Sequence, residues 1–291
     1  MQDFDQLWNY NEPAATAEKF LALLANSSIE KDKNYHLELL SQVARTYSLR
    51  GLFAEAHQYL SQIEPFLEDK PTVFAIRYHL EKGRTHNSSG EKELAKPHFE
   101  KAEQLALAVG EDAYALDALH MLAIAHVPPL SIQYNEKALL LAQKSGNVQA
   151  QKWQGALYNN LGWDYFDLGQ YEDALRIFLQ ALKWREEQQS AREFFLAKWC
   201  VARTLRALNR LNEAIKIQLA LMEEMLELSQ PDGYVYEELG ELYLLRNEPI
   251  HKMYFQFTLN ELGQNPYLLK NEAARINRWK ILAEEHPEKL N

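Results

Sequence analysis

The stretch "LYNNLGWDYFDLGQYEDAL", residues 157–175, decides the fold of this chain. Together with the next six residues it alternates large and small side chains at helical spacing: Tyr158, Leu161, Gly162 and Tyr165 first, then Ala174, Phe178 and Ala181. A small residue on each of two helices lets them cross closely, while the large residues fill the space between them. The stretch therefore predicts a helical hairpin.

The same pattern recurs on both sides of this stretch. The recurring positions are Val43, Ala44, Tyr47, Gly51, Ala56 and Leu60; Gly83, Gly90, Ala95, Phe99 and Ala102; Leu122 and Ala123; Val201, Ala202, Leu208, Ala214 and Leu221; and Tyr236, Leu239, Gly240 and Tyr243. Equivalent positions in successive second helices are 39, 36, 43 and 40 residues apart. Repeated hairpins of this kind stack on their neighbours and build an elongated domain.

The pattern resembles the tetratricopeptide repeat over residues 34–260. The resemblance implies an all-α, right-handed α-solenoid of about six helical hairpins with terminal capping helices, in one domain spanning residues 1–291. Residues 1–33 would form an N-terminal cap and residues 261–291 a C-terminal cap, with helices over 13–25 and 265–283 that each begin near a proline. The stretches "LYNNLGW", "WCVARTLRALNR" and "DGYVYEEL" are also similar to a group of bacterial tetratricopeptide proteins.

The third hairpin departs from the pattern, because its join is about four residues short and contains Pro128 and Pro129. Proline lacks the amide hydrogen that would continue a helix, and it disfavours helical geometry in the residue before it. We expect the first helix of this hairpin to be about one turn shorter than those ending near Leu168 and Leu208.

Composition limits the class of partner. The chain has 31 basic and 41 acidic side chains, a formal net charge of −10, which argues against nucleic acid or an anionic membrane surface as the main partner. The first residues are acidic rather than basic, and no apolar run approaches the roughly 18 residues that span a bilayer. With a single cysteine, Cys200, these features predict a cytoplasmic protein.

The first helices of the hairpins are expected to line an inner wall, and helical geometry identifies the side chains opposite each packed small residue. The candidate peptide- or ligand-binding residues on this wall are Arg77, Arg84, His120, Asn159, Asn160, Trp163, Trp199, Arg203, Arg206 and Glu237. Asparagine amides can satisfy both the donors and the acceptors of an extended peptide. Asn160 also suits a generic repeat, and Asn159 could simply be solvated.

Arginines on the wall of an acidic protein are the strongest functional signal, because the planar guanidinium captures carboxylate or phosphate with two hydrogen bonds. Internal pairing is the alternative: Arg84 has Glu81 one turn away, and Arg206 is within reach of Glu237 or Glu238 on the next hairpin. Trp163, Trp199 and Tyr234 would form an aromatic ledge, or pack between hairpins.

The chain shows no motif for catalysis or a cofactor. It has no glycine-rich phosphate loop, no Gly-x-Ser-x-Gly and no His-x3-His spacing, so neither enzyme activity nor a metal or cofactor is expected. We interpret His120 as a structural histidine, Cys200 as a buried residue, and residues 87–90 as the turn of a hairpin.

These observations favour a non-catalytic scaffold that binds an extended, carboxylate-bearing peptide or protein tail in its groove. The alternative is a regulatory subunit that senses a small anionic metabolite or signalling peptide. An open groove along several repeats would favour the first function, and a closed polar pocket of small-molecule size the second.

Overall fold

The computed structural model describes residues 3–68, 70–189 and 191–284, and every regular element in these ranges is helical. In chain order the elements are η1 (Phe4–Leu7), α1 (Pro13–Ala25), α2 (Lys33–Ser48), α3 (Phe53–Ser61), η2 (Glu64–Phe66), α4 (Val73–Ser88), α5 (Lys92–Ala108), α6 (Asp112–Ala125), α7 (Leu130–Lys144), α8 (Val148–Lys152), α9 (Gln154–Asp167), α10 (Tyr171–Glu187), α11 (Ala191–Ala207), α12 (Leu211–Glu227), α13 (Gly233–Leu245), α14 (His251–Leu262), α15 (Pro266–Asn271) and α16 (Ala273–Glu284). No helix within the described ranges combines the length and the apolar character needed to cross a membrane.

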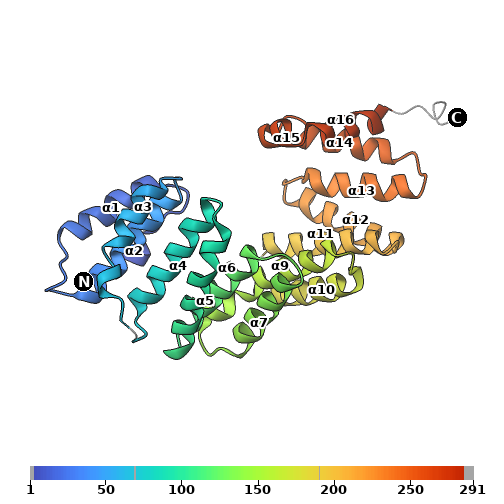
Figure 1. The fold of residues 1–291 in the computed structure, drawn as a ribbon. Helices are drawn as coiled ribbons and strands as arrows, with labels where there is room; N and C mark the ends of the chain where they lie inside the picture. Colours follow the sequence, from blue (N-terminus) through green and yellow to red (C-terminus); the bar gives the residue numbers. More distant parts are fainter. Residues whose placement is uncertain (1–2, 69, 190, 285–291) are drawn as a thin grey trace. The chain divides into compact units, whose positions relative to one another are not determined.

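The chain divides into two compact units, Met1–Leu157 and Tyr158–Asn291, and the division falls inside helix α9. In the first unit α2 packs on α3, α4 on α5, and α6 on α7, and in the second α11 packs on α12 and α13 on α14. Figure 1 shows these pairs as successive helical hairpins. With α9 and α10 they give the six hairpins and the all-α solenoid class predicted from the sequence. The single-domain organisation over residues 1–291 stays a prediction.

The sequence predicts the N-terminal capping helix correctly but not the C-terminal one. Helix α1 spans the 13–25 range that was expected. The predicted helix over 265–283 is instead two helices, because α15 ends at Asn271 and α16 begins at Ala273. Glu272 between them has φ −134° and ψ 35°, outside helical geometry. That part of the prediction is wrong. The apolar residues keep helical spacing on both sides of Glu272, so the sequence pattern showed no sign of a break.

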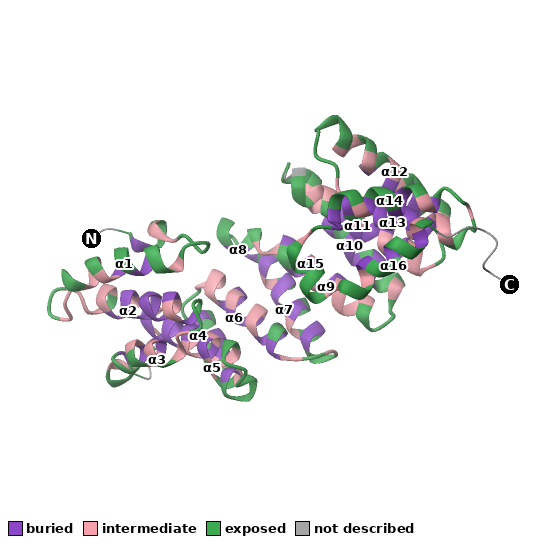
Figure 2. Cartoon of the chain, turned by 90° about the horizontal axis from the view of Figure 1, so that it is seen from above, coloured by how far each residue is buried: buried purple, intermediate pink, exposed green. Residues whose placement is uncertain are grey.

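Small residues lie at the helix crossings, as the repeat pattern requires. A Cβ atom added to Gly83 would lie 2.5 Å from Cε1 of Phe99, and one added to Gly162 would lie 2.4 Å from Cε1 of Phe178. Both phenylalanines are buried. In Figure 2 the buried residues follow the helix faces that meet their neighbours. In these two hairpins a phenylalanine ring therefore packs directly against the backbone of a glycine on the other helix.

The prediction of a shortened first helix in the third hairpin holds against α11 but is wrong against α9, because α6 and α9 both have 14 residues and α11 has 17. The double proline does end α6 sooner after its packed small residue. Helix α6 ends at Ala125, two residues after the packed Ala123, whereas α9 ends at Asp167, five residues after the packed Gly162. The difference of three residues is close to one helical turn. Residues 126–129 separate α6 from α7, and the connection contains a turn in which the Leu130 amide donates to the Val127 carbonyl at 3.1 Å.

The segment Asn87–Gly90 forms the turn predicted for it. Helix α4 ends at Ser88, and Gly90 has a φ of 90°, a left-handed conformation that glycine adopts without a steric penalty. The Glu91 amide then donates to the His86 carbonyl at 2.8 Å. This arrangement closes the helix end.

Four of the nine histidines cluster between α3, α4 and α5. Nδ1 of His79 and Nδ1 of His98 are 3.0 Å apart, the His86 ring stacks on His98, and the His57 ring lies 4.9 Å from that of His86. Burial, with a contribution from neighbouring charges, lowers the pKa of both His79 and His98 to about 4. At neutral pH the pair is therefore uncharged, and one ring donates to the other.

This pair makes stability depend on pH. Because the two pKa values are lower in the folded chain than the ordinary 6.5, the unfolded chain binds more protons and stability falls as pH drops from 6.5 through about 4. We expect wild type to lose at least about 1.4 kcal/mol more than His98→Gln over this window, the equivalent of one pKa unit. Urea unfolding at several pH values measures this difference. Equal losses in the two proteins would contradict it. The pKa values of these rings also respond to the charges of Lys82, Lys101 and Glu64. These three residues are the same in wild type and His98→Gln.

Candidate functional site

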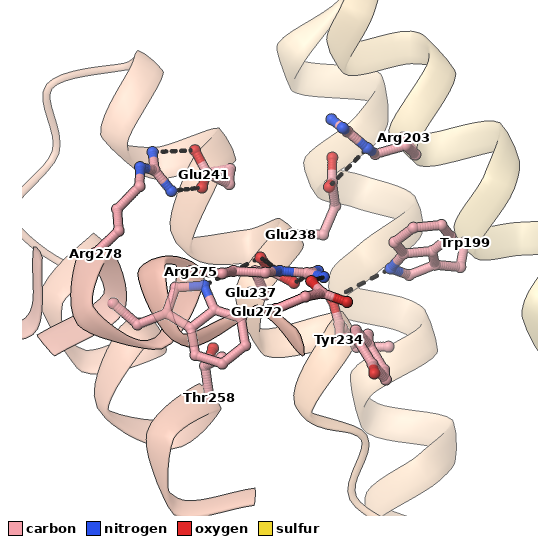
Figure 3. Close-up of polar contacts among 12 residues, drawn as sticks. Trp199, Arg203, Tyr234, Glu237, Glu238, Glu241, Thr258, Glu272, Arg275 and Arg278 are labelled. Atoms are coloured by element: carbon pink, nitrogen blue, oxygen red, sulfur yellow. Dashed lines mark hydrogen bonds and ion pairs between the residues drawn. The ribbon is translucent and has the colours of Figure 1, made fainter. Parts of the chain in front are cut away.

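A cavity of about 430 Å³ in the second unit brings together five of the predicted wall residues. The residues that line it are Trp163 from α9, Trp199, Arg203 and Arg206 from α11, Glu237, Glu238 and Glu241 from α13, and Arg275 from α16. Figure 3 shows most of these side chains converging from α11, α13 and α16. Its lining is therefore mainly ionic, with two indoles at one side.

The repeat sets the register of this cavity. Trp163 directly follows the packed Gly162, and Arg203 directly follows the packed Ala202, so the two side chains occupy the same position in successive first helices. Glu238 lies two residues before Gly240 on the next first helix. Once the small residue is turned towards the second helix, these positions face the opposite side.

Glu238 is the charged centre of the cavity and is 3% exposed. It accepts hydrogen bonds from Nε and Nη2 of Arg206 at 2.5 and 3.1 Å. Burial raises the pKa of this carboxyl to about 7, and Arg206 partly offsets that rise. The carboxylate thus depends on Arg206 to remain ionised in a site with little water.

Arg203 shares the same carboxylate, but loosely. Its Nε lies 3.8 Å from Oε2 of Glu238, and its guanidinium lies over the Phe166 ring at 5.5 Å. Among the residues of the described ranges, none accepts a hydrogen bond from it. Its side chain is 31% exposed. Glu238 thus contacts both arginines, but of these two it forms hydrogen bonds with Arg206 alone, and Arg203 retains its hydrogen-bond donors.

The two tryptophans both pack and line the cavity. Trp163 meets the buried Phe178 edge to face at 5.3 Å, and its ring centroid is 6.2 Å from that of Trp199. The Trp199 indole donates to the backbone carbonyl of Tyr234 at 3.2 Å (Figure 3). These contacts hold the indoles in place beside Arg203, so they form a preorganised apolar wall.

The last helix closes the acidic side of the cavity. Arg275 of α16 donates from Nε to Glu237 at 2.8 Å and from Nη1 to Glu272 at 2.7 Å, and Arg278 forms two hydrogen bonds with Glu241 (Figure 3). The Trp279 indole also donates to Glu237 at 3.0 Å. Sequence reasoning missed this contribution. One signal was available in the sequence. Arg275 and Arg278 are three residues apart on a terminal helix, and Glu237 and Glu241 are four residues apart on the wall that this helix faces.

The predicted arginines of the first unit are internally paired. Arg84 donates to Glu81 at 2.5 Å and to both oxygens of Asp117. Arg77 donates to both oxygens of Asp5. Both arginines line a second cavity, of about 300 Å³, in that unit. The alternative of internal pairing, weighed for Arg84 and Arg206, holds for both and also for Arg77.

The remaining predicted site residues lie elsewhere. Asn159 and Asn160 are on α9, one turn before Trp163, and do not line the cavity of the second unit. These two amides therefore do not share that cavity with Arg203 and Arg206, although all four were predicted to lie on one wall. His120 lies beside the Trp153 ring at 5.3 Å, and burial is the main cause of its lowered pKa.

Two further features bear on chemistry. In the part of the chain that the structure describes, no group of three or more His, Cys, Asp or Glu side chains is arranged to hold a metal ion. Cys200 is buried, as predicted, and burial raises the pKa of its thiol to about 12. A thiol with that pKa is protonated at neutral pH and is a poor nucleophile.

Comparisons with known proteins agree with this fold. Family models described as tetratricopeptide repeat match residues 76–108 and 155–187, which cover hairpins α4–α5 and α9–α10. The sequence matches none of the curated proteins.

Two solved structures are similar over most of the chain. One is a signal transduction ATPase with numerous domains from Pyrococcus horikoshii, which has a tetratricopeptide repeat sensor. It has a TM-score of 0.72 and 18% identity, over 92% of this chain and 42% of that one. The other is the apo form of RapI, with a TM-score of 0.71 and 14% identity over 94% and 79%. The chain thus spans less than half the length of the ATPase. At these identities the likeness to the two solved structures concerns the fold alone, and the tetratricopeptide repeat itself is matched in two hairpins, α4–α5 and α9–α10.

Proposed function

We propose that this chain is a non-catalytic interaction scaffold whose second unit binds a carboxylate-bearing peptide or protein tail in the cavity around Arg203. The main support for this proposal is that the Arg203 guanidinium is held in the cavity without a hydrogen-bond partner among the described residues. It is a partly exposed guanidinium beside two fixed indoles, with one loose ion pair and no hydrogen bond to any described residue. A ligand carboxylate would give it the two-point partner that Glu238 gives Arg206.

The two arginines would then have different roles. Arg206 is committed to the buried Glu238, so it holds the cavity together. Arg203 is available to the ligand, and Glu238 keeps its guanidinium facing the cavity. Trp163 and Trp199 would cover the apolar part of the bound peptide, as rigid aromatics commonly do at the centre of interfaces.

Selection from a random peptide library with free C-termini provides a ligand with which to test this function. We expect the selected peptides to be acidic, and we expect Arg203→Ala to weaken their binding roughly tenfold or more, since a charged hydrogen bond contributes about 1.5–3 kcal/mol. Arg210→Ala is the matched control, because Arg210 is an exposed arginine that pairs with Glu213 outside the cavity. Equal loss in both variants would contradict a specific role for Arg203.

Sensing of a small anion is the second candidate. The cavity volume of about 430 Å³ falls in the range of small-molecule sites. The sensor repeats of the Pyrococcus horikoshii protein have the same fold. Titration with small dicarboxylates separates the two functions, because a scaffold should prefer the longer peptide and a sensor should not gain from the peptide's additional residues.

A further inference from the structure

The segment that precedes α1 lies across two first helices of the first unit. Asp5 of this segment accepts two hydrogen bonds from Arg77 of α4, one of them 3.0 Å from Nη1 to Oδ1. The Trp8 indole donates to Oε1 of Gln42 on α2 at 3.0 Å. The segment therefore presents an acid and an indole, three residues apart, to polar groups on two successive hairpins.

Arg77 needs an acid at this place. It is 8% exposed and lies between the rings of Phe4 and Tyr114, each 5.3 Å from the guanidinium carbon. The remaining nearby acid is Glu38, whose Oε2 lies 3.4 Å from Nε of Arg77 without forming a hydrogen bond. Burial lowers the pKa of Arg77, but the hydrogen bonds to Asp5 and the charge interactions with Tyr114, Asp5 and Glu38 together outweigh it, so the pKa is raised. Removing Asp5 without replacing it would leave a buried cation short of its two-point partner.

The segment covers this site without filling it. It contains a single short 3-10 turn, η1, from which Phe4 is buried while the Asp5 side chain is 47% exposed. Tyr10, at the end of the segment, is 64% exposed. A cavity of about 300 Å³ remains beneath it, lined in part by Asp5, Trp8, Tyr10 and Arg45. Arg45 has a loose ion pair of 3.6 Å with Glu81, as Arg203 has with Glu238 in the second unit.

We propose that residues 3–11 are a tethered ligand for a second peptide site, centred on Arg77 and Gln42, and that a partner carrying an Asp-x-x-Trp sequence displaces them. The occupant itself defines the chemistry, because Asp5 and Trp8 make the two specific polar contacts. The site lies in the first unit and shares no lining residue with the cavity around Arg203, so its test is independent of the function proposed above.

If residues 3–11 are a tethered ligand, they should compete with a free peptide of the same sequence for the site. A ligand on a short flexible link competes at an effective concentration on the order of millimolar, so a free copy binds weakly until the tethered copy is impaired. Asp5→Asn impairs it by removing the charge that Arg77 holds, and it leaves the buried Phe4 in place. The free copy must then bind better to the variant than to wild type, whereas a purely structural segment would show no such gain.

The experiment uses a synthetic, fluorescein-labelled peptide with the sequence of residues 3–11 and measures its anisotropy with the full chain. We expect Asp5→Asn to bind it at least tenfold more tightly than wild type. Arg77→Gln in the Asp5→Asn background should remove the gain. A labelled peptide with asparagine in place of both aspartates should show no gain either. Equal affinity for wild type and Asp5→Asn, or a gain that survives Arg77→Gln, would overturn the proposal.

Hydrogen exchange on the wild-type chain tests the same inference without a substitution. If the segment leaves its site by local opening, the amides of Trp8 and Asn9 should exchange at least a hundredfold faster than buried amides of α2 such as Ala44. Protection equal to that of Ala44 would mean that the segment leaves only when the unit unfolds, and the proposal would be wrong.

Discussion

Arg206→Ala should lower the free energy of unfolding by about 3–5 kcal/mol at pH 8, because it leaves Glu238 charged and buried with the loose contact to Arg203 as its nearest support. Burial already raises the pKa of Glu238 to about 7. Without Arg206 the carboxyl would take up a proton more readily, so the loss should shrink as pH falls towards 5. Urea unfolding at the two pH values measures both effects.

A double substitution separates the lost ion pair from lost packing. In Arg206→Ala/Glu238→Gln no charge remains to be stranded, so this variant should be more stable than Arg206→Ala alone at pH 8. Arg210→Ala should leave the unfolding midpoint unchanged, since that arginine is exposed. If Arg206→Ala proved as stable as Arg210→Ala, Glu238 would not depend on Arg206.

Gly162→Leu should cost about 1–3 kcal/mol or more through overpacking. The added Cβ alone would lie 2.4 Å from the ring of Phe178, which is buried and cannot move aside without disturbing the hairpin. A thermal unfolding scan measures the loss as a lower midpoint.

Gly146→Leu is the matched control for this substitution. A Cβ atom on Gly146 would meet no atom within 4 Å, so the same change of residue should leave the midpoint within a degree or two of wild type. Equal midpoints for the two leucine variants would show that Gly162 is not at a helix crossing.

The fold was predictable because its signal is local and repeated. Gly162 and Phe178 are 16 residues apart, and the same small-and-large pattern occurs along the chain. A crossing of two helices needs only that pattern, so the hairpins follow from it, whereas α1 was placed by the proline at its start. The break between α15 and α16 was not predictable in this way, because no proline or glycine marks Glu272.

The candidate site was predictable in its register, but its pairing was predictable only between neighbouring turns and hairpins, as for Arg84 with Glu81 and Arg206 with Glu238. The position after each packed small residue faces away from the second helix, which places Trp163 and Arg203 correctly. Two of the pairings involve segments outside the repeats: Asp5 is 72 residues from Arg77, and Arg275 is 38 residues from Glu237. Hydrophobic periodicity carries no information about which charges meet across such separations.

The division of roles between Arg203 and Arg206 is most directly tested by measuring Arg203→Ala twice, once for stability and once for binding. Arg203 makes no hydrogen bond to any described residue, so urea unfolding should show a change in the free energy of unfolding of less than about 1 kcal/mol. Calorimetric titration with a selected acidic peptide should show binding weakened roughly tenfold or more. A large loss of stability with unchanged peptide affinity would instead place Arg203 in the internal ion-pair network of Glu238 and contradict its role in binding.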